Sequence, residues 1–478
     1  DVLGSRGLGD VYKRQIMFAK QYLKESKPEG SESTTRDIGV LGAMNYTYDN
    51  KYLFDASFRT NASSQFGSNN RWGSFWSLGI GWNMHKENFI NEEIFNTLKI
   101  RGSLGYTGSQ SADAYAALAT YQYILDRTYT NYLGTHLKGM KNDDLKWQRK
   151  LDYNAGIDIN IKRRISVTFD IYKSITDNTL TSLTLPYSNG FTSVQENLGA
   201  VINRGFDIRT QFTILQNVKE RSYLTANLNI SRNKNWLEDI SDAMTAYNES
   251  QQKKAADRSN NTPVQMYYDG VSMRAIWGMK SLGIDPQNGR EIYLTRNGVP
   301  TYTYSAGEQV ILGDELPKFQ GTAGLSFEWK GIGGNASFTF QYGAQMYNST
   351  LISKVENADL NKNVDKRLYD GVWRPGDEGK IKPYKNLGTV WIPEEGAYAK
   401  LKTNPTSRFV QDRNEFTLSN LSLYYDFYRH GFLKKCGIER LKVSAYANNL
   451  FTLSSIEIER GTSYPFSRSF NFSVSATF

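Results

Sequence analysis

Cysteine is almost absent from this sequence, since Cys436 is the only one among 478 residues. No internal disulfide can therefore form, and a thiolate metal cluster is excluded. The three histidines, His85, His136 and His430, lie far apart along the chain. Metal sites usually take their ligands from clusters with short spacings, so we expect turn or loop positions for these histidines, with no metal site and no cofactor.

Long apolar runs are also absent. No stretch approaches the ~20 apolar residues that a membrane helix needs, and the mean hydropathy is −0.55. Helical membrane spans are thus excluded, whereas a membrane barrel is not, because its strands alternate apolar with polar residues. Residues 1–15 have no apolar core of a secretory signal and no period that continues beyond them, so we expect a non-native, artefactual segment there. Residues 16–36 are expected to be part of an upstream strand or loop.

Aromatic residues and glycine are abundant, with 31 Tyr, 24 Phe, 9 Trp and 40 Gly against 11 Pro. This composition favours β-structure with many turns. The net charge of +9 comes from Lys and Arg residues that are scattered along the chain. The scatter argues against nucleic acid as a partner; it fits a solvated basic surface, contact with phosphate-bearing lipid headgroups, or an acidic ligand.

A period-two alternation of apolar and polar residues begins at about Asp37 and recurs to the last residue. Its segments are about ten residues long, the length of a tilted membrane strand rather than of an average soluble strand. Aromatic residues crowd the segment ends, as in interfacial girdles. Within these expected strands the clearest alternation covers residues 39–48, 52–58, 76–82, 98–106, 153–161, 165–171, 206–214, 224–230, 325–329, 336–342, 421–427, 441–447 and 470–478.

Short and long connections alternate between these segments. The short ones include residues 49–51, 162–164, 216–221 and 330–334, and the long ones 108–150, 177–203, 233–317 and 344–411. Short turns at one end and long extracellular loops at the other are typical of an outer-membrane barrel. A large soluble β-protein, such as a propeller, is the alternative, and both strand length and loop alternation argue against it.

The strand count predicts an open structure. Bacterial single-chain barrels have an even number of strands, because both ends of the sheet return to the same side of the membrane. About 13 strands therefore indicate an all-β, antiparallel transmembrane β-barrel that is incomplete, with residues 37–478 as its C-terminal part. An open edge in hydrocarbon leaves backbone N–H and C=O groups unpaired, so we expect further strands upstream.

Several stretches resemble one family. YTYDNKYLFDASF at 46–58, SSQFGSNNRWG at 63–73 and the Gly-Trp strand end before Glu87-Asn88-Phe89 are similar to the barrel of SusC/RagA-like TonB-dependent transporters. As a set the matching stretches are highly specific, and they cover nearly everything from Asp37 onward. The match continues through residues 98–110, 196–208, 316–331, 372–379, 414–427 and 447–454.

The resemblance implies a barrel of about 22 strands, of which about 13 are present, in the bacterial cell outer membrane. It implies active import of a bulky nutrient, with an oligosaccharide expected and a peptide as the other ligand class. The implied partners are a SusD-like surface lipoprotein over the extracellular mouth, TonB acting through an upstream region, outer-membrane lipid and the barrel-assembly machinery.

No catalytic constellation is found, so we do not expect an enzyme. Asp143-Asp144 and Glu92-Glu93 are adjacent carboxylates, and neighbouring residues on a strand point to opposite faces. We expect these pairs to solvate loops and turns.

Function in a barrel transporter resides in the long loops. Their aromatic residues are candidates to stack on sugar rings or to cap a ligand; packing of loop against loop is the alternative, and we favour it for any single residue. The candidates are Tyr267, Tyr268, Trp277, Trp373 and Trp391.

Two functions compete at this point. The first is import through a plugged barrel; the second is a surface glycan-binding protein or adhesin without transport. A plug and a TonB box in the upstream sequence distinguish the first from the second. A passive porin is a third reading, which the length of the loops disfavours.

The chain ends inside a strand pattern, FNFSVSATF, with an aromatic as its last residue. By resemblance to outer-membrane barrels, such an ending is the signal that the barrel-assembly machinery recognises. The residues that we assign to it are Phe470, Phe472, Val474 and Phe478.

Removal of Phe478 is expected to lower insertion into the outer membrane, because the assembly signal loses its terminal ring. The measurement is the amount of heat-modifiable barrel in the membrane fraction. An unchanged amount would contradict the assignment.

Overall fold

The computed structural model describes residues 32–478, apart from residues 111, 130–131, 185–192, 198, 241, 257–261, 360, 362–363, 428–430, 436 and 457–467. The expected artefactual segment 1–15, most of the expected upstream segment 16–36, and both Cys436 and His430 lie outside these described residues.

One large antiparallel sheet dominates the protein. It has 13 strands, and their order across the sheet follows their order along the chain. The sheet is open between β1 and β24, which lie at its two edges. The expected all-β, antiparallel, incomplete barrel is thereby confirmed, and its strands run longer than the sequence pattern indicated, up to 18 residues in β11. The strands are β1 (Asp37–Tyr48), β2 (Tyr52–Ser63), β3 (Trp72–Asn83), β4 (Phe95–Ser109), β7 (Gln148–Ile161), β8 (Ile165–Asp177), β11 (Ala200–Asn217), β12 (Ser222–Glu238), β18 (Phe319–Trp329), β19 (Ile332–Tyr347), β22 (Val410–Asp426), β23 (Arg440–Ser454) and β24 (Ser469–Thr477).

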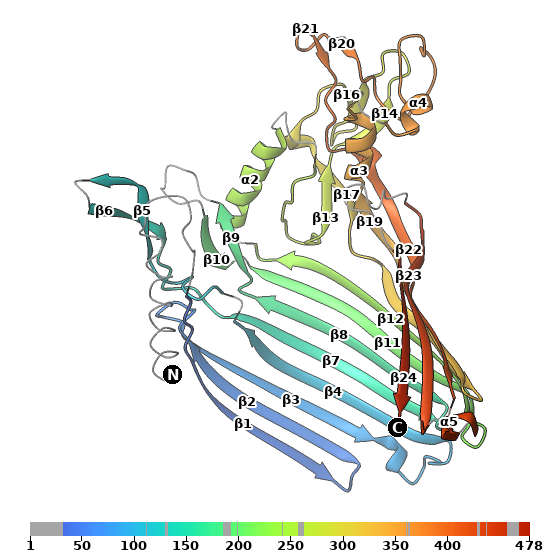
Figure 1. Ribbon diagram of the computed structural model, residues 1–478. Helices are drawn as coiled ribbons and strands as arrows, with labels where there is room; N and C mark the ends of the chain where they lie inside the picture. Colours follow the sequence, from blue (N-terminus) through green and yellow to red (C-terminus); the bar gives the residue numbers. More distant parts are fainter. Residues whose placement is uncertain are drawn as a thin grey trace, which may run out of the picture.

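The sheet has a turn end and a loop end (Figure 1). At the turn end, tight turns join β1 to β2, β7 to β8 and β18 to β19. Asp49, Asn50, Lys162, Arg163 and Lys330 adopt positive φ there. This left-handed conformation costs ordinary residues about 1 kcal/mol, and it matches the twist of the flanking strands.

Apolar side chains form rows across one face of the sheet, which we call the outer face. The pairing places Ile100, Ile157, Phe169, Ile208 and Ile230 in one row, on five successive strands. On the outer face Ile80 is 65% exposed and Phe472 82% exposed. Continuous rows of exposed apolar side chains mark a surface that contacts lipid or another protein, and on a long-stranded sheet whose opposite face is polar they mark the membrane-contacting face.

The opposite face, the inner face, carries polar rows in the same register. One row begins at Lys99 and Asp158, continues through Thr168 and Arg209, and reaches Asn229 on β12. Since side chains alternate with period two, a slip of one residue would bring these charges to lipid. The register is therefore strongly specified.

Ion pairs join several strands at the turn end. Asp426 has a side chain that is 1% exposed and accepts from Arg221 at 2.6 Å and from Arg440 at 2.7 Å. Arg221 also reaches Glu328 at 2.9 Å. The contacts connect the β11–β12 turn with β18, β22 and β23.

The long connections hold secondary structure of their own, which the sequence pattern did not predict. Figure 1 shows most of these elements gathered at the loop end, while α5 and the helical turn Met84–Lys86, which lies between β3 and β4, are at the turn end. Among the described residues, no helix is long and apolar enough to cross a bilayer. The strands are β5 (Thr120–Tyr129), β6 (Tyr132–Gly139), β9 (Leu180–Thr184), β10 (Ser193–Asn197), β13 (Ala275–Gly278), β14 (Lys280–Ile284), β15 (Glu291–Leu294), β16 (Pro300–Thr301), β17 (Val310–Asp314), β20 (Thr389–Ile392) and β21 (Ala397–Lys400). The helices are α2 (Asp242–Ala256), α3 (Ser349–Leu351), α4 (Arg367–Gly371) and α5 (Gly431–Lys435), with single helical turns at Met84–Lys86, Ala306–Glu308, Ile352–Glu356 and Ser407–Phe409.

The SSQFGSNNRWG stretch anchors the loop between β2 and β3 to the loop between β4 and β7. Phe66 is 1% exposed and stacks on Trp147 with ring centroids 4.3 Å apart. Ser68 donates to the carboxylate of Asp143 at 2.7 Å. The backbone N–H of Gly67 donates to the carbonyl of Leu145 at 3.1 Å, so the two loops lie in direct backbone contact.

Gly67→Ala is expected to destabilise this anchor. A Cβ at position 67 would lie 2.0 Å from the Asp143 carbonyl oxygen and 2.9 Å from that of Asn142, both of which are backbone atoms. Overpacking of this kind costs about 1–3 kcal/mol. We expect a lower midpoint for the loss of the heat-modifiable form, together with faster tryptic cleavage between residues 64 and 147.

Gly307→Ala is the matched control in another loop, because the nearest atom to its Cβ is Ser305 Oγ at 3.7 Å. Equal midpoints for the two variants would contradict the assigned role of Gly67.

Candidate functional site

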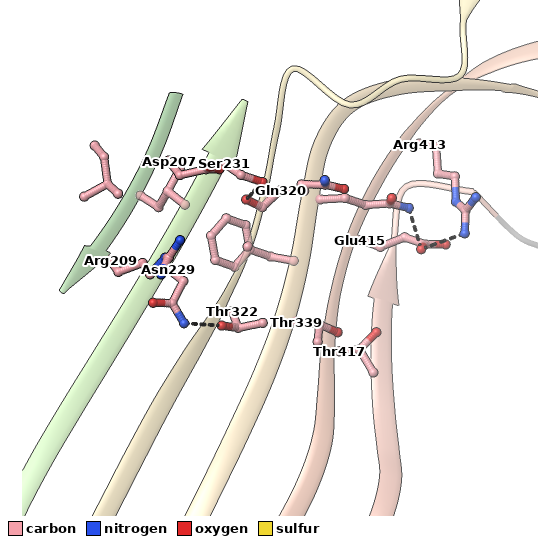
Figure 2. Close-up of a pocket in the computed structure, with 15 residues that line it drawn as sticks. Asp207, Arg209, Asn229, Ser231, Gln320, Thr322, Thr339, Arg413, Glu415 and Thr417 are labelled. Carbon is pink, nitrogen blue, oxygen red and sulfur yellow. Dashed lines mark hydrogen bonds and ion pairs between the residues drawn. The ribbon is translucent and has the colours of Figure 1, made fainter. Parts of the chain in front are cut away.

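A polar hollow lies on the inner face, across β11, β12, β18, β19 and β22 (Figure 2). Its volume is about 680 Å³. We call it the inner-wall hollow. Because these strands are hydrogen-bonded neighbours, the polar rows of the inner face converge there. Its polar lining is formed by Asp207, Arg209, Asn229, Ser231, Gln320, Thr322, Thr339, Gln341, Arg413, Glu415 and Thr417.

Hydrogen bonds across the strands order part of this lining. Asn229 Nδ2 donates to Thr322 Oγ1 at 2.9 Å. Glu415 Oε2 accepts from Gln341 Nε2 at 2.7 Å and from Arg413 Nη2 at 3.0 Å. Among the described residues, Arg413 Nε and Glu415 Oε1 are buried without a hydrogen-bond partner. The hollow therefore offers both donors and acceptors to a hydroxyl-rich ligand or to a polypeptide backbone.

Metal chemistry has no evident site in this part of the protein. Within the ranges that the structure describes, no group of three or more His, Cys, Asp or Glu side chains is arranged to hold a metal ion. The adjacent carboxylates Asp143 and Asp144 bind other loop residues, namely Ser68 and Asn69.

Two of the five candidate loop aromatics are packed inside the loops. Trp277 is 6% exposed, and its indole N–H donates to the Met266 carbonyl at 3.1 Å. Trp373 is 5% exposed and donates to the Pro286 carbonyl at 3.0 Å. Both placements agree with the packing interpretation, and burial leaves little of either ring to meet a ligand.

The other three candidates are more accessible and do not form one site. Tyr268 lies against Trp277, with ring centroids 5.3 Å apart, and Tyr267 stacks on Tyr247 at 5.8 Å. Trp391 is 50% exposed on the separate β20–β21 hairpin. It contacts Tyr398, which is 73% exposed, edge to face at 5.2 Å. Of the five, Trp391 has the most open surface for a ligand or a partner protein.

The proposed assembly residues lie on or just beyond the edge strand β24. Phe470, Phe472 and Val474 pair with Ala447, Ala445 and Val443 of β23, and therefore point to the outer face. Phe478 directly follows the strand and is 82% exposed. The strand geometry fits recognition of this edge, and the assembly role remains a prediction.

A buried charge cluster joins the two largest loops, 239–318 and 348–409. Arg408 lies 2.8 and 2.9 Å from the carboxylate oxygens of Glu291 and 2.7 Å from Glu356. The Glu291 and Glu356 side chains are 2% and 0% exposed. Burial disfavours the charged guanidinium, and the two carboxylates outweigh that effect and raise the pKa of Arg408.

Sequence reasoning missed this charge cluster. Its members are separated by 117 and 52 positions, and none of them lies in a motif. Only the folded loops bring them together, so no local signal was available.

The comparisons with known proteins agree on one family. Residues 17–450 match the model of the TonB dependent receptor-like, beta-barrel family. The chain is 27% identical over 482 residues to TonB-dependent receptor P39 of Formosa agariphila, an alignment that covers 90% of this chain and 43% of that protein. It is 29% identical over 319 residues to TonB-dependent receptor SusC of Bacteroides thetaiotaomicron, covering 63% of this chain and 30% of SusC. The chain thus spans less than half the length of these relatives.

Solved structures show the same fold. The chain superimposes on one from the RagAB peptide transporter with a TM-score of 0.73 at 22% identity, over 88% of this chain and 44% of that one. A structure of the RagAB peptide importer in its open-open state gives a TM-score of 0.74 at 22% identity, over 93% of this chain and 47% of that one.

Arg408→Ala is expected to loosen the contact between the two largest loops. Removing one partner of a buried ion pair leaves charges without compensation and typically costs about 3–5 kcal/mol. Tryptic cleavage within 239–318 and 348–409 should become faster, while the heat-modifiable sheet persists.

Arg274→Ala serves as the control, because Arg274 pairs with Glu315 at 3.4 Å with side chains that are 64% and 50% exposed. Such a surface pair contributes about 1 kcal/mol at most. Equal protease sensitivity of the two variants would refute the structural role of Arg408.

Proposed function

This chain belongs to the TonB-dependent receptor-like β-barrel family and lies in the bacterial outer membrane; from that premise we propose that it forms part of the barrel of an active importer for a bulky oligosaccharide. The observation that carries the proposal is the inner-wall hollow. It sets hydroxyl, amide and charged groups of five strands along the barrel interior. A chain of sugar hydroxyls can exchange hydrogen bonds along such a wall without entering an apolar region.

The loop end fits a site of capture. Exposed aromatic rings suit the apolar faces of sugar rings, and Trp391 with Tyr398 offers two such rings at the tip of the β20–β21 hairpin. We assign the first contact with the ligand to this hairpin. We assign the later passage of the ligand through the barrel to the inner-wall hollow.

The importer requires partners outside this chain. A SusD-like surface lipoprotein over the extracellular loops would retain the ligand, and TonB would supply force from the inner membrane. RagAB, whose fold this chain shares, is a peptide transporter and importer. Peptides are therefore the second ligand class to test here, and binding without transport is the competing function.

The function is tested in a strain that lacks the gene and is complemented with the full-length protein. We expect accumulation of labelled oligosaccharides to require both the protein and TonB. A peptide digest of matched size forms the second arm. Accumulation of peptides alone would overturn the oligosaccharide assignment, and surface binding that does not depend on TonB would overturn import.

Trp391→Ala is expected to lower the initial uptake rate about twofold to tenfold, because loss of an aromatic contact costs about 0.5–1.5 kcal/mol. Tyr369→Ala is the control: Tyr369 is 76% exposed in the same large loop, and the structure places it in α4 rather than in the hairpin. Both variants must reach the membrane in wild-type amounts. Equal uptake by Trp391→Ala and wild type would contradict the role of the hairpin.

A further inference from the structure

A second, smaller cavity lies between the two largest loops. Loop 239–318 contributes Tyr293, Tyr302 and Tyr304, and loop 348–409 contributes Lys385 and Ile392. Its volume is about 250 Å³. We call it the loop cavity. It is lined by different residues from the inner-wall hollow.

Lys385 is the unusual group in this cavity. It is 2% exposed, and its Nζ donates to the carbonyl of Leu401 at 2.5 Å. In the part of the chain that the structure describes, no salt bridge to Lys385 is found. An ammonium has three N–H donors, and burying a charge without a counter-ion is costly. The cavity therefore contains a cation with capacity for an anionic partner.

Three carboxylates, Glu291, Glu394 and Glu395, and two further cations, Arg290 and Lys402, line the cavity beside Lys385. Glu291 and Glu356 are both held by Arg408, and Glu394 at the cavity rim pairs with Arg290 at 2.7 Å. These carboxylates lower the positive electrostatic potential at the Lys385 ammonium without contacting it. An anion that enters the cavity would meet the ammonium of Lys385, for which the described residues provide no carboxylate at salt-bridge distance.

Titration of Lys385 is consistent with this environment. Burial lowers its pKa to about 8, opposed by the charges of Glu356 and Glu291 and assisted by Arg408. The group is thus mainly protonated at pH 7 and loses its proton just above that value.

The backbone around Lys385 is held on both sides. The N–H of Tyr384 donates to the Gly371 carbonyl at 3.1 Å, and that of Asn386 to the Gly289 carbonyl at 3.0 Å. A cation fixed in this way is preorganised, so a ligand would not have to order it on binding.

Tyrosine rings form the wall beside the ammonium. Tyr293 OH accepts from Asn404 Nδ2 at 2.9 Å, and Tyr304 OH accepts from Gln309 Nε2 at 2.6 Å. The two rings meet edge to face, with centroids 5.7 Å apart. Each hydroxyl acts as an acceptor in these bonds and still carries its O–H donor, so the wall offers a ligand phenolic hydroxyls as well as apolar ring surface, which suits the C–H face of a sugar ring.

We propose that the loop cavity binds one sugar residue that carries a carboxylate or a sulfate group, with the anion at Lys385 and the sugar ring against the tyrosines. This inference rests on the proposed function and narrows its ligand to an anionic oligosaccharide. A volume of about 250 Å³ is below the ~300–1,000 Å³ of ordinary small-molecule sites. The cavity therefore accommodates a single ring, while the rest of the chain extends outside it.

The test uses the full-length protein in detergent and isothermal titration calorimetry at pH 7. The probes are methyl glucuronide, a sulfated glucose, neutral methyl glucoside and an acidic dipeptide. We expect binding of one or both anionic sugars, which identifies the anion, and none of the neutral sugar. Binding of the neutral sugar with equal affinity, of the dipeptide alone, or of no probe would overturn the inference.

Two variants test the cavity in different ways, one by removing its charge and the other by filling its volume. Lys385→Met removes the charge at similar volume and should weaken binding about tenfold to a hundredfold, the usual effect of losing a charge-assisted hydrogen bond. Ile392→Trp fills the cavity from the β20 side and leaves every charge in place, so it should also abolish binding. Lys400→Met is the control, since Lys400 is an exposed lysine of β21 outside the cavity lining. Wild-type affinity in both cavity variants would refute the site.

The pH profile separates a direct contact from a structural role. Between pH 7 and pH 9 the sugar anion stays charged, while Lys385 with its pKa of about 8 loses its proton. Affinity should therefore fall roughly tenfold for each pH unit above this pKa. Lys385→Met should show a flat profile, and a wild-type profile that is equally flat would contradict the inference.

Uptake measurements keep this inference apart from the proposed function. TonB-dependent uptake of oligosaccharides by the wild type, without any probe binding at Lys385, would refute the cavity assignment and leave import standing. Probe binding that Lys385→Met abolishes, in a protein that imports nothing, would refute import and leave the binding site standing.

Discussion

Backbone hydrogen bonding in hydrocarbon is the constraint on which this structure depends. No water is available there, so each N–H and C=O must find a partner within the sheet. Apart from the open edges of β1 and β24, the 13 strands meet that demand by pairing with their neighbours in one antiparallel ladder, which β-bulges interrupt at a few positions. The ladder fixes the register, and the register fixes the faces: Ile100, Ile157 and Phe169 meet lipid, while Lys99 and Asp158 meet the interior. The inner-wall hollow follows from the same alternation, because polar rows of adjacent strands must lie side by side.

At the loop end the chain is in water, so its structure depends on hydrophobic cores within the loops rather than on the strand ladder. Phe66 and Trp147 form part of one such core, and Leu351, Val355 and Phe409 belong to another. The buried ion pairs of Arg408 fix how the two largest loops are oriented relative to each other, because ion pairs are directional and apolar packing is not. Such a cluster tolerates little rearrangement, because each of its buried charges must keep an oppositely charged partner. The loops are consequently held in one arrangement, and cavities between them keep a defined shape.

The sequence predicted the sheet well and the loops poorly, for a physical reason. The strand pattern is local, since period two over about ten residues suffices to identify a face. The expected segments therefore lie within the observed strands, as 153–161 does in β7 (Gln148–Ile161), apart from Phe427 and Phe478, which are each one residue beyond a strand. Loop structure depends on contacts between distant residues, such as Arg408 with Glu291 across 117 positions. The aromatic candidates make the same point: Trp373 and Trp391 are alike in type, yet one is 5% and the other 50% exposed. Burial of a loop residue is decided by tertiary packing, which composition does not encode.

The division between wall and loops also bears on how specificity can arise in such a protein. A side chain on the sheet is constrained twice, by its face and by neighbours on both adjacent strands. A loop side chain is constrained only by its local core. Chemistry that distinguishes one ligand from another therefore belongs at the loop end, where Lys385 sits on backbone tied to Gly371 and Gly289 through its neighbours. The wall, lined by Thr322, Thr339 and Thr417 in one row, offers hydroxyl groups that suit many polar ligands equally. These two sets of constraints support the proposal that a ligand is selected at the loops and then passes along the wall.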